Sequence, residues 1–288
     1  MKKIAITGAS GLVGQELIPA LKAAGYDPIA LRRPYSRDSL AGVTAIINLA
    51  GENLSAGRWT MERKRRITDS RVNTLNTLRE ILQSGPHIVN TMISASAAGY
   101  YGTTTSDHIY TEEDLPGDDF LAGVCRKWET AADSFQPFGI RVAKVRIGVV
   151  FSDKGGALPK LTMPLKFGIS VPLGSGNQWL PWIHIDDLVR VFLYLLQHDE
   201  LSGPFNAAAP NPVTNKQLMK LLAKDHHRIF LPIGIPAFLL RLLLGEMASV
   251  TLEGSRISAE KLMGTGFEFR FPSFTNPQTS SAQSVYYS

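Results

Sequence analysis

The feature that most constrains the fold is a glycine-rich turn near the start of the chain. An apolar run at residues 4–6 leads into the sequence TGASGLVG at residues 7–14, and a helical pattern of apolar residues follows. This order predicts a strand, a tight turn and a helix whose N-terminus faces a ligand. The free backbone N–H groups and the dipole of such a helix favour an anion, and glycine lets the backbone approach it. The turn therefore predicts a dinucleotide site.

Length and composition are those of a globular α/β protein. The chain has 288 residues, of which 44% are hydrophobic and 19% charged, enough for one large domain or for a large domain with a smaller one. The net charge of +5 includes one basic block, residues 63–66, which is typical of a solvated helix face. We therefore expect no nucleic-acid partner, whereas the mild basic excess suits an anionic small molecule.

The few cysteine and histidine residues limit the disulfides and metal sites that the chain can form. A single cysteine, Cys125, excludes an intrachain disulfide and a cysteine-rich metal site, and the histidines lack the spacing of metal ligands, so we expect no metal. One cysteine also favours a reducing compartment. The glycine turn begins too early for a signal peptide, and the most apolar stretch, residues 233–244, is too short to span a bilayer. We expect a cytoplasmic protein with no membrane partner.

Strand and helix patterns alternate along the first two thirds of the chain. This alternation predicts a Rossmann-type, doubly wound parallel sheet with helices on both faces, followed by a smaller C-terminal α+β region on the substrate side. The apolar periodicity places strands at 28–31, 45–50, 88–94, 141–147 and 182–184, and helices at 12–24, 62–83, 120–135 and 187–197.

The same pattern predicts a division of the chain. We expect the dinucleotide-binding domain at residues 1–168, with residues 182–210 returning to it, because the alternation persists through these segments. Residues 169–272 read mainly as the substrate-side, C-terminal region. A polar tail at residues 273–288 is expected to be poorly ordered.

Two arginines follow the second predicted strand. In a dinucleotide-binding unit this strand ends beside the adenosine ribose, where an acidic residue favours NAD and an arginine accommodates the 2′-phosphate of NADP. Arg32 and Arg33 stand here, with no acidic residue beside them. A guanidinium binds a phosphate through a bidentate fork. We therefore expect NADP as the cofactor, with NAD less favoured; the alternative is that both arginines are ordinary surface residues.

Four segments in order resemble a known superfamily. They are TGASGLVG at 7–14, NLAGEN at 48–53, SASAAGYYG at 94–102 and WIHIDDL at 182–188. Together they resemble the extended short-chain dehydrogenases/reductases, and more narrowly the atypical branch of NAD-dependent epimerase/dehydratase-like, or nucleoside-diphosphate-sugar-epimerase-like, proteins. The segment 235–272 resembles the small domain of unknown function that closes these proteins. The resemblance covers nearly the whole chain except the tail, and implies a substrate cleft roofed by the C-terminal third.

The glycine turn, the strand ends and the resemblance give a candidate cofactor site. Small residues at the end of the third predicted strand let a cofactor pass over the backbone. The resemblance implies that Arg71, on the next helix, lies near the cofactor, where its donors suit a phosphate or carboxylate; a helix-surface salt bridge is the alternative. The residues expected to bind the cofactor are Gly8, Ser10, Gly11, Leu12, Val13, Gly14, Arg32, Arg33, Leu49, Ala50, Gly51 and Arg71.

The chain departs from the superfamily at the residues that carry its chemistry. The resemblance implies a serine, a tyrosine and, four residues after the tyrosine, a lysine, which move a proton in step with hydride transfer. The matching positions hold Ala97, Leu121 and Cys125, so the usual proton relay is missing. Tyr100 and Tyr101, at the end of the fourth predicted strand, are the candidate catalytic residues, with aromatic packing as the alternative.

Other polar side chains have weaker claims. Lys127 and Glu129 are candidate acid/base residues on the helix at 120–135, although a solvated helix face also explains Lys127. His184 and Asp186 resemble a catalytic pair, but we expect a structural role, with Asp186 as the N-cap of the following helix.

Two functions are compatible with these features. The first is an NADP(H)-binding epimerase or oxidoreductase that acts on an unidentified small substrate, with sugar nucleotides as the class that the resemblance implies. The second is a catalytically inactive NADP(H)-binding sensor or scaffold, supported by the loss of the three expected groups. The apolar residues 238–240 also indicate a helix able to pack against a second copy in a homo-oligomer.

Overall fold

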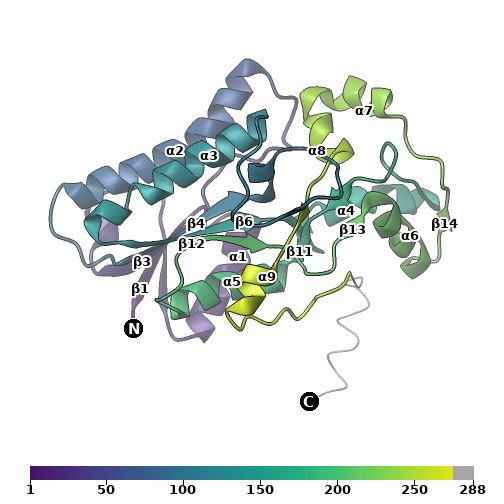
Figure 1. Ribbon diagram of the computed structural model, residues 1–288. Coiled ribbons are helices and arrows are strands. Elements are labelled where there is room, and N and C mark those ends of the chain that lie inside the picture. Colours follow the sequence, from purple (N-terminus) through teal and green to yellow (C-terminus); the bar gives the residue numbers. More distant parts are fainter. Residues whose placement is uncertain (275–288) are drawn as a thin grey trace, which may run out of the picture.

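The computed structural model describes residues 1–274, and its centre is a six-stranded parallel sheet (Figure 1). The strand order is β12-β6-β4-β3-β1-β2, and every neighbouring pair is parallel. The order reverses at β1, whose two neighbours are β2 and β3, so the sheet is doubly wound as predicted. The bounds of the six strands are β1 (Lys3–Thr7), β2 (Asp27–Ala30), β3 (Val43–Asn48), β4 (Thr91–Ala97), β6 (Arg141–Ile147) and β12 (Gly203–Ala207).

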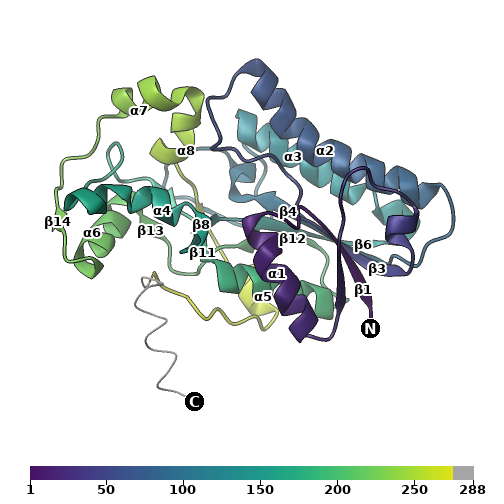
Figure 2. The ribbon, with the colours of Figure 1, turned by 180° about the vertical axis from the view of Figure 1, so that it is seen from behind.

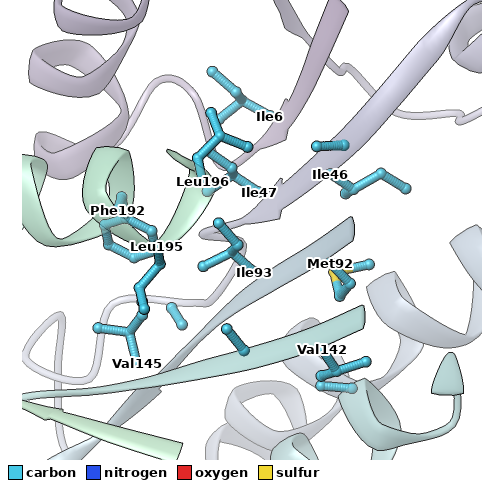
Figure 3. Packing of buried hydrophobic residues seen from close by; sticks show 14 of the residues in the cluster. Ile6, Ile46, Ile47, Met92, Ile93, Val142, Val145, Phe192, Leu195 and Leu196 are labelled. Carbon is cyan, nitrogen blue, oxygen red and sulfur yellow. The ribbon is translucent and has the colours of Figure 1, made fainter. Parts of the chain in front are cut away.

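Two pairs of helices cover the two faces of this sheet. Helices α1 (Leu12–Ala23) and α5 (Ile185–Gln197) pack together on one face, and α2 (Met61–Gln83) and α3 (Phe120–Asp133) on the other (Figures 1 and 2). Because both faces are covered, the central strands are apolar on both sides. Figure 3 shows this core: Ile6, Ile47, Ile93 and Val145 lie near the α5 side chains Phe192, Leu195 and Leu196, and Ile46, Met92 and Val142 lie apart from them.

Smaller elements gather at the carboxyl ends of the central strands (Figure 1). The helices there and nearby are α4 (Leu158–Leu161), α6 (Asn215–Asp225), α7 (Ala237–Leu244), α8 (Ser249–Leu252) and α9 (Glu260–Gly264). The short strands are β5 (Ile109–Tyr110), β7 (Val149–Ser152), β8 (Gly155–Gly156), β9 (Ile169–Ser170), β10 (Trp179–Leu180), β11 (Trp182–His184), β13 (Val213–Thr214), β14 (Ile229–Phe230) and β15 (Arg256–Ile257). Short 3₁₀ helices lie at Asp38–Leu40, Ala98–Tyr101, Gln136–Phe138, Met163–Phe167 and Gly245–Ala248.

Several predicted bounds differ from the structure by one to three residues, as at β2, β3, β4 and α5, and one predicted helix cap differs as well. Strand β4 begins at Thr91 rather than at residue 88, because Ile88 is 62% exposed and outside the sheet. Helix α5 begins at Ile185, and its N-cap is His184, whose Nδ1 accepts a hydrogen bond from the backbone N–H of Asp186 at 3.2 Å. Asp186 is therefore not the cap. The imidazole of His184 caps the helix in place of the Asp186 carboxylate, which was expected to cap it.

The expected tail at residues 273–288 lies mostly outside the described residues, which end at 274. Within the described part, Phe274 is buried, and its ring packs edge-on against Phe151 and Trp182 with centroid distances of 5.7 Å to each. The Phe274 ring therefore belongs to the apolar cluster that contains Phe151 and Trp182.

At two positions of the turn after β1 the surrounding backbone leaves no room for a side chain, so only glycine fits there. Gly8 has φ +68°, and a Cβ added to it would lie 2.6 Å from the carbonyl oxygen of Leu49. A Cβ added to Gly14 would lie 2.7 Å from both Ala9 Cα and the carbonyl oxygen of Gly8. The turn and the first turn of α1 therefore pack backbone against backbone, which holds the helix N-terminus at the end of β1.

We expect Gly14→Ala to destabilise the protein by about 1–3 kcal/mol, because the added methyl group overpacks a rigid backbone contact. Gly123→Ala is the matched control. Gly123 lies within α3 with nothing within 4 Å of an added Cβ, so alanine there should stabilise the protein by about 1 kcal/mol through helix propensity. Urea denaturation measures both changes. Equal effects of the two substitutions would contradict the packing account.

Candidate functional site

A groove of about 720 Å³ opens at the carboxyl ends of β1 and β3. These strands are neighbours at the point where the strand order reverses, which is where open α/β sheets bind their ligands. The volume lies within the roughly 300–1,000 Å³ of typical ligand sites. The groove is lined by Gly8, Ala9, Ser10, Ile18, Ala30, Leu31, Arg32, Arg33, Tyr35, Ala50, Gly51, Glu52 and Ser70.

The structure brings the glycine turn, both arginines and the end of β3 to this one groove. Of the predicted cofactor residues, six line it directly: Gly8, Ser10, Arg32, Arg33, Ala50 and Gly51. The others support it or lie next to it: Gly11 is the N-cap of α1, Leu12 and Val13 form its first turn, Gly14 packs against Ala9, and Leu49 packs against Gly8.

The N-terminus of α1 is suited to an anion. Gly11 caps the helix without a side-chain hydrogen bond, and its first turn contains no acidic residue. The first N–H groups of a helix have no partner within the helix and carry the positive end of its dipole. The short turn after β1 places these groups beside the groove.

The two arginines differ in how they are held. The Arg33 guanidinium donates from Nη2 to Thr74 Oγ1 on α2 at 3.0 Å, which fixes it at the wall of the groove. Arg32 is exposed and makes no hydrogen bond or ion pair with any residue in the described range 1–274. The groove therefore holds one oriented guanidinium and one whose donors are available to an anionic ligand.

A second cavity, of about 200 Å³, lies at the carboxyl ends of β4 and β6. Ala97, Leu121 and Cys125, the positions at which the resemblance implies a serine, a tyrosine and a lysine, all line it. The cavity is bounded by residues of the C-terminal region as well. Its lining residues are Leu54, Arg71, Ala97, Ala98, Gly99, Gly102, Thr103, Leu121, Val124, Cys125, Trp128, Ile147, Gly148, Val149, Trp179, Leu180, Pro181, Val250, Glu253, Gly254 and Ser255.

Arg71 lies between the groove and the second cavity. Its guanidinium donates to the carbonyl oxygens of Ile67 at 2.9 Å and Glu52 at 3.2 Å, and lies over the Trp128 ring at 4.9 Å. Burial lowers the pKa of Arg71. A Cβ added to Gly51 would lie 2.9 Å from the guanidinium carbon, so Gly51 on the groove and Arg71 on the cavity are in direct contact. The alternative of a surface salt bridge for Arg71 is therefore wrong.

Cys125 replaces the expected lysine with a neutral thiol. Burial raises the pKa of Cys125 to about 12, with the nearby Glu129 carboxylate adding to the effect. Its Sγ donates to the carbonyl oxygen of Ala97 at 3.8 Å. At neutral pH this side chain keeps its proton and cannot supply the positive charge that a lysine would.

Tyr100 and Tyr101 do not line the second cavity. The Tyr101 side chain is 2% exposed; its hydroxyl donates to Asn206 Oδ1 at 2.7 Å and accepts from Arg146 Nη1 at 2.9 Å. Burial raises the pKa of Tyr101 to about 12, against the opposing effect of Arg146. The Arg146 guanidinium lies over the Tyr100 ring, 3.4 Å from its centroid. This geometry favours aromatic packing, the alternative for both tyrosines.

Glu129 has a structural partner rather than a free carboxylate. It accepts from Arg146 through both oxygens, Nε to Oε1 at 2.9 Å and Nη2 to Oε2 at 3.0 Å, and from Ser96 Oγ at 2.7 Å. All three side chains are buried. The acid/base hypothesis for Glu129 is not supported, because the carboxylate is fully engaged, and Lys127 is exposed on the outer face of α3.

We expect Glu129→Gln to destabilise the protein by about 3–5 kcal/mol, because it leaves the Arg146 charge buried without its counter-ion. The matched control is Asp69→Asn, which breaks the exposed Arg65–Asp69 pair on α2 (3.4 Å) and should cost no more than about 1 kcal/mol. Chemical denaturation measures both. A small loss for Glu129→Gln would contradict the importance assigned to the buried pair.

Sequence reasoning missed the C-terminal residues of the second cavity. Trp179, Val250, Glu253 and Ser255 line it from segments far from the glycine turn in sequence. None of them belongs to a motif with a recognisable spacing, and only the general expectation of a cleft covered by the C-terminal third anticipated their contribution.

Two family models match the chain. The NAD dependent epimerase/dehydratase family matches residues 4–208, and a domain of unknown function (DUF1731) matches residues 235–276. The chain belongs to the NAD dependent epimerase/dehydratase family.

Relatives extend over almost the full chain. An epimerase family protein of Staphylococcus epidermidis is 35% identical over 96% of this chain and 97% of its own, and the epimerase family protein YfhF of Bacillus subtilis is 34% identical over 93% and 94%. Among solved structures, the human epimerase family protein SDR39U1 with NADPH has a TM-score of 0.84 at 28% identity, covering 94% of this chain and 96% of its own. MoeE5 with UDP-glucose and NAD, at 18% identity and a TM-score of 0.74 over 97% and 96% of the two chains, shares the fold.

Neither a membrane-spanning helix nor a metal-holding cluster of side chains occurs among the described residues, 1–274. No helix there is both long and apolar enough to cross a bilayer. The same residues contain no group of three or more histidine, cysteine, aspartate or glutamate side chains placed to hold a metal ion.

Proposed function

We propose that the chain binds NADP(H) along the groove and works as an oxidoreductase or epimerase on a small molecule held in the second cavity. One observation carries this proposal: Gly51 on the groove contacts Arg71 on the cavity, so a ligand that follows the groove past β3 reaches the cavity wall. A bound nicotinamide supplies or takes up a hydride. The apolar wall formed by Leu121 and Val124 excludes water from the same space.

The residues of the groove fit a dinucleotide with a 2′-phosphate. The close backbone packing at Gly8 and Gly14 holds the N-terminus of α1 beside the groove, where its free N–H groups suit a diphosphate. Arg32 and Arg33 lie on the groove where the adenosine ribose is expected. An acidic side chain at this place would repel the 2′-phosphate. The human relative was solved with NADPH, which supports the choice of NADP.

The alternative is a sensor or scaffold that binds NADP(H) without turnover. The specific observation in its favour is that Ala97, Leu121 and Cys125 line the cavity and none of them transfers a proton near neutral pH. A second cavity next to the cofactor groove is of no use to a pure sensor, and we therefore place the enzyme first.

Three further assignments stay proposals. Residues 1–168 with 182–210 form the cofactor domain, supported by the return of β12 to the central sheet, and residues 169–272 form mainly the substrate side. The cytoplasm is the proposed location. Homo-oligomer formation through α7 is supported by the exposure of Phe238, Leu242 and Leu243.

We expect replacement of both Arg32 and Arg33 by alanine to weaken NADP binding by about a hundredfold or more, because each of the two lost hydrogen bonds to a charged group contributes about 1.5–3 kcal/mol. NAD, which lacks the 2′-phosphate, should lose little. Arg37→Ala is the control, because its guanidinium donates to the carbonyl oxygens of Ser84 and Pro86 and does not line the groove. Isothermal titration gives the affinities. Equal losses for NADP and NAD would refute the role of the arginines.

The two tyrosines provide a second test. Tyr101→Phe removes a hydroxyl bonded to Asn206 and Arg146, so we expect a loss of about 1–3 kcal/mol in the free energy of unfolding. Tyr100→Phe should change stability little, since its ring contact with Arg146 remains. A hydride-transfer assay on a panel of small carbonyl compounds is run on both variants. If either variant folds normally but has a lower kcat, that result would support a catalytic role for the tyrosine and contradict the packing role that the geometry favours.

A further inference from the structure

We infer that the second cavity accepts a small, mainly apolar molecule without a phosphate or diphosphate group, and that Glu253 helps to exclude anions from it. The inference rests on the proposed function in taking this cavity as the substrate site. It deepens that function by naming a substrate class different from the sugar nucleotides that the family resemblance implies.

The wall of the cavity is mainly apolar, although Arg71, Thr103, Glu253 and Ser255 also line it. Helix α3 contributes Leu121 and Val124, the end of β6 contributes Ile147, β10 contributes Trp179, and α8 contributes Val250. Burial of apolar surface is favourable at roughly 25 cal/mol per Å². A ligand with an aromatic or aliphatic body is stabilised by this wall, whereas a hydroxyl-rich sugar ring would lose hydrogen bonds to water.

Cationic side chains are almost absent from the cavity. Among its described lining residues, Arg71 is the one cation, and two of its donors already bond to the carbonyl oxygens of Ile67 and Glu52. Recognition of a phosphate or diphosphate usually employs several charge-assisted donors. The chain places such donors in the cofactor groove, at Arg32 and Arg33, and not here.

An acidic pocket adjoins the cavity. This pocket of about 510 Å³ shares Thr103, Leu121 and Glu253 with the lining of the cavity, so the two spaces lie side by side. The carboxylates on the lining of this pocket are Asp119, Glu246 and Glu253, against one cation, Arg241. An anion that enters through this pocket meets a net negative charge.

Glu253 is the carboxylate best placed to act on a ligand. It stands at the border shared by the two spaces, and its Oε2 accepts a hydrogen bond from Thr105 Oγ1 at 2.9 Å. Within residues 1–274 it has no salt bridge, whereas Glu246 is paired with Lys64. Asp119 accepts hydrogen bonds from the backbone N–H groups of Thr103 and Ala122. Glu253 therefore leaves its negative charge uncompensated.

The volume of the second cavity also favours a small ligand over a nucleotide sugar. The cavity of about 200 Å³ is smaller than the roughly 300–1,000 Å³ of sites for drug-sized ligands. A nucleotide sugar carries a base, a ribose ring, a diphosphate and a sugar ring. It is too large for a cavity of this volume. The cavity suits a molecule of about one ring.

The test compares three probes on the protein saturated with NADP⁺, by isothermal titration with tryptophan fluorescence as a second readout, since Trp128 and Trp179 line the cavity. The probes are benzyl alcohol, benzoate and UDP-glucose. We expect benzyl alcohol to bind, benzoate to bind at least about tenfold more weakly because of like-charge repulsion, and UDP-glucose not to bind.

Three variants assign the effect to residues. Glu253→Gln should remove most of the difference between benzoate and benzyl alcohol. Glu246→Gln, whose carboxylate is already paired with Lys64, should leave that difference in place. Val250→Trp, on the partly exposed helix α8, should fill the cavity and abolish benzyl alcohol binding while NADP⁺ affinity stays unchanged.

The outcomes separate the two proposals. The affinity for NADP⁺ is measured first, and the probe titrations are repeated on the cofactor-free protein. A lack of NADP⁺ binding would therefore overturn the proposed function but leave the inference about the cavity open to test. Binding of UDP-glucose in the cavity, preference for benzoate over benzyl alcohol, or failure of benzyl alcohol to bind would each overturn the inference about substrate class.

Discussion

The buried ion pair between Glu129 and Arg146 is the interaction on which the candidate site depends. It joins α3 to β6, and the hydroxyl of Ser96 adds β4 to the same carboxylate. Tyr101 carries the network on to Asn206 of β12, whose amide donates to the carbonyl oxygen of Ser258 in the C-terminal region. A buried carboxylate and guanidinium are costly apart, so this network fixes the position of α3 relative to the sheet. The cavity wall on α3 is fixed with it.

This scaffold holds the part of the cavity wall at which the chain departs from the residues that the family resemblance implies. Leu121 and Cys125 stand on α3 where a tyrosine and a lysine are expected, and the packing of the helix is preserved by Glu129. With Leu121 and Val124 the α3 part of the wall is apolar. Polar side chains come from Arg71 on α2 and from the C-terminal region, where Glu253 and Ser255 line the cavity. We propose that the reacting molecule is selected by this region rather than by the family positions.

Local sequence patterns predicted the bounds of some strands closely and the roles of single polar residues poorly. The bounds of β6 and β11 agree with the expected 141–147 and 182–184, because alternating or continuous apolar residues report burial directly. The roles of His184, Glu129 and Tyr101 depend on partners 2 to 105 residues away in sequence, which periodicity does not report. Glu253 reaches the cavity through tertiary packing alone. The glycine turn was informative because the steric requirement at Gly14, set by Gly8 and Ala9, lies within a few residues.

The most direct test of the account is a crystal structure of the protein with NADP⁺. We predict that the 2′-phosphate lies within about 3 Å of the guanidinium groups of Arg32 and Arg33, as charge-assisted hydrogen bonds require. The nicotinamide ring should lie at the cavity wall formed by Leu121 and Cys125. A cofactor whose 2′-phosphate contacts neither arginine, or whose nicotinamide lies away from this wall, would contradict the account.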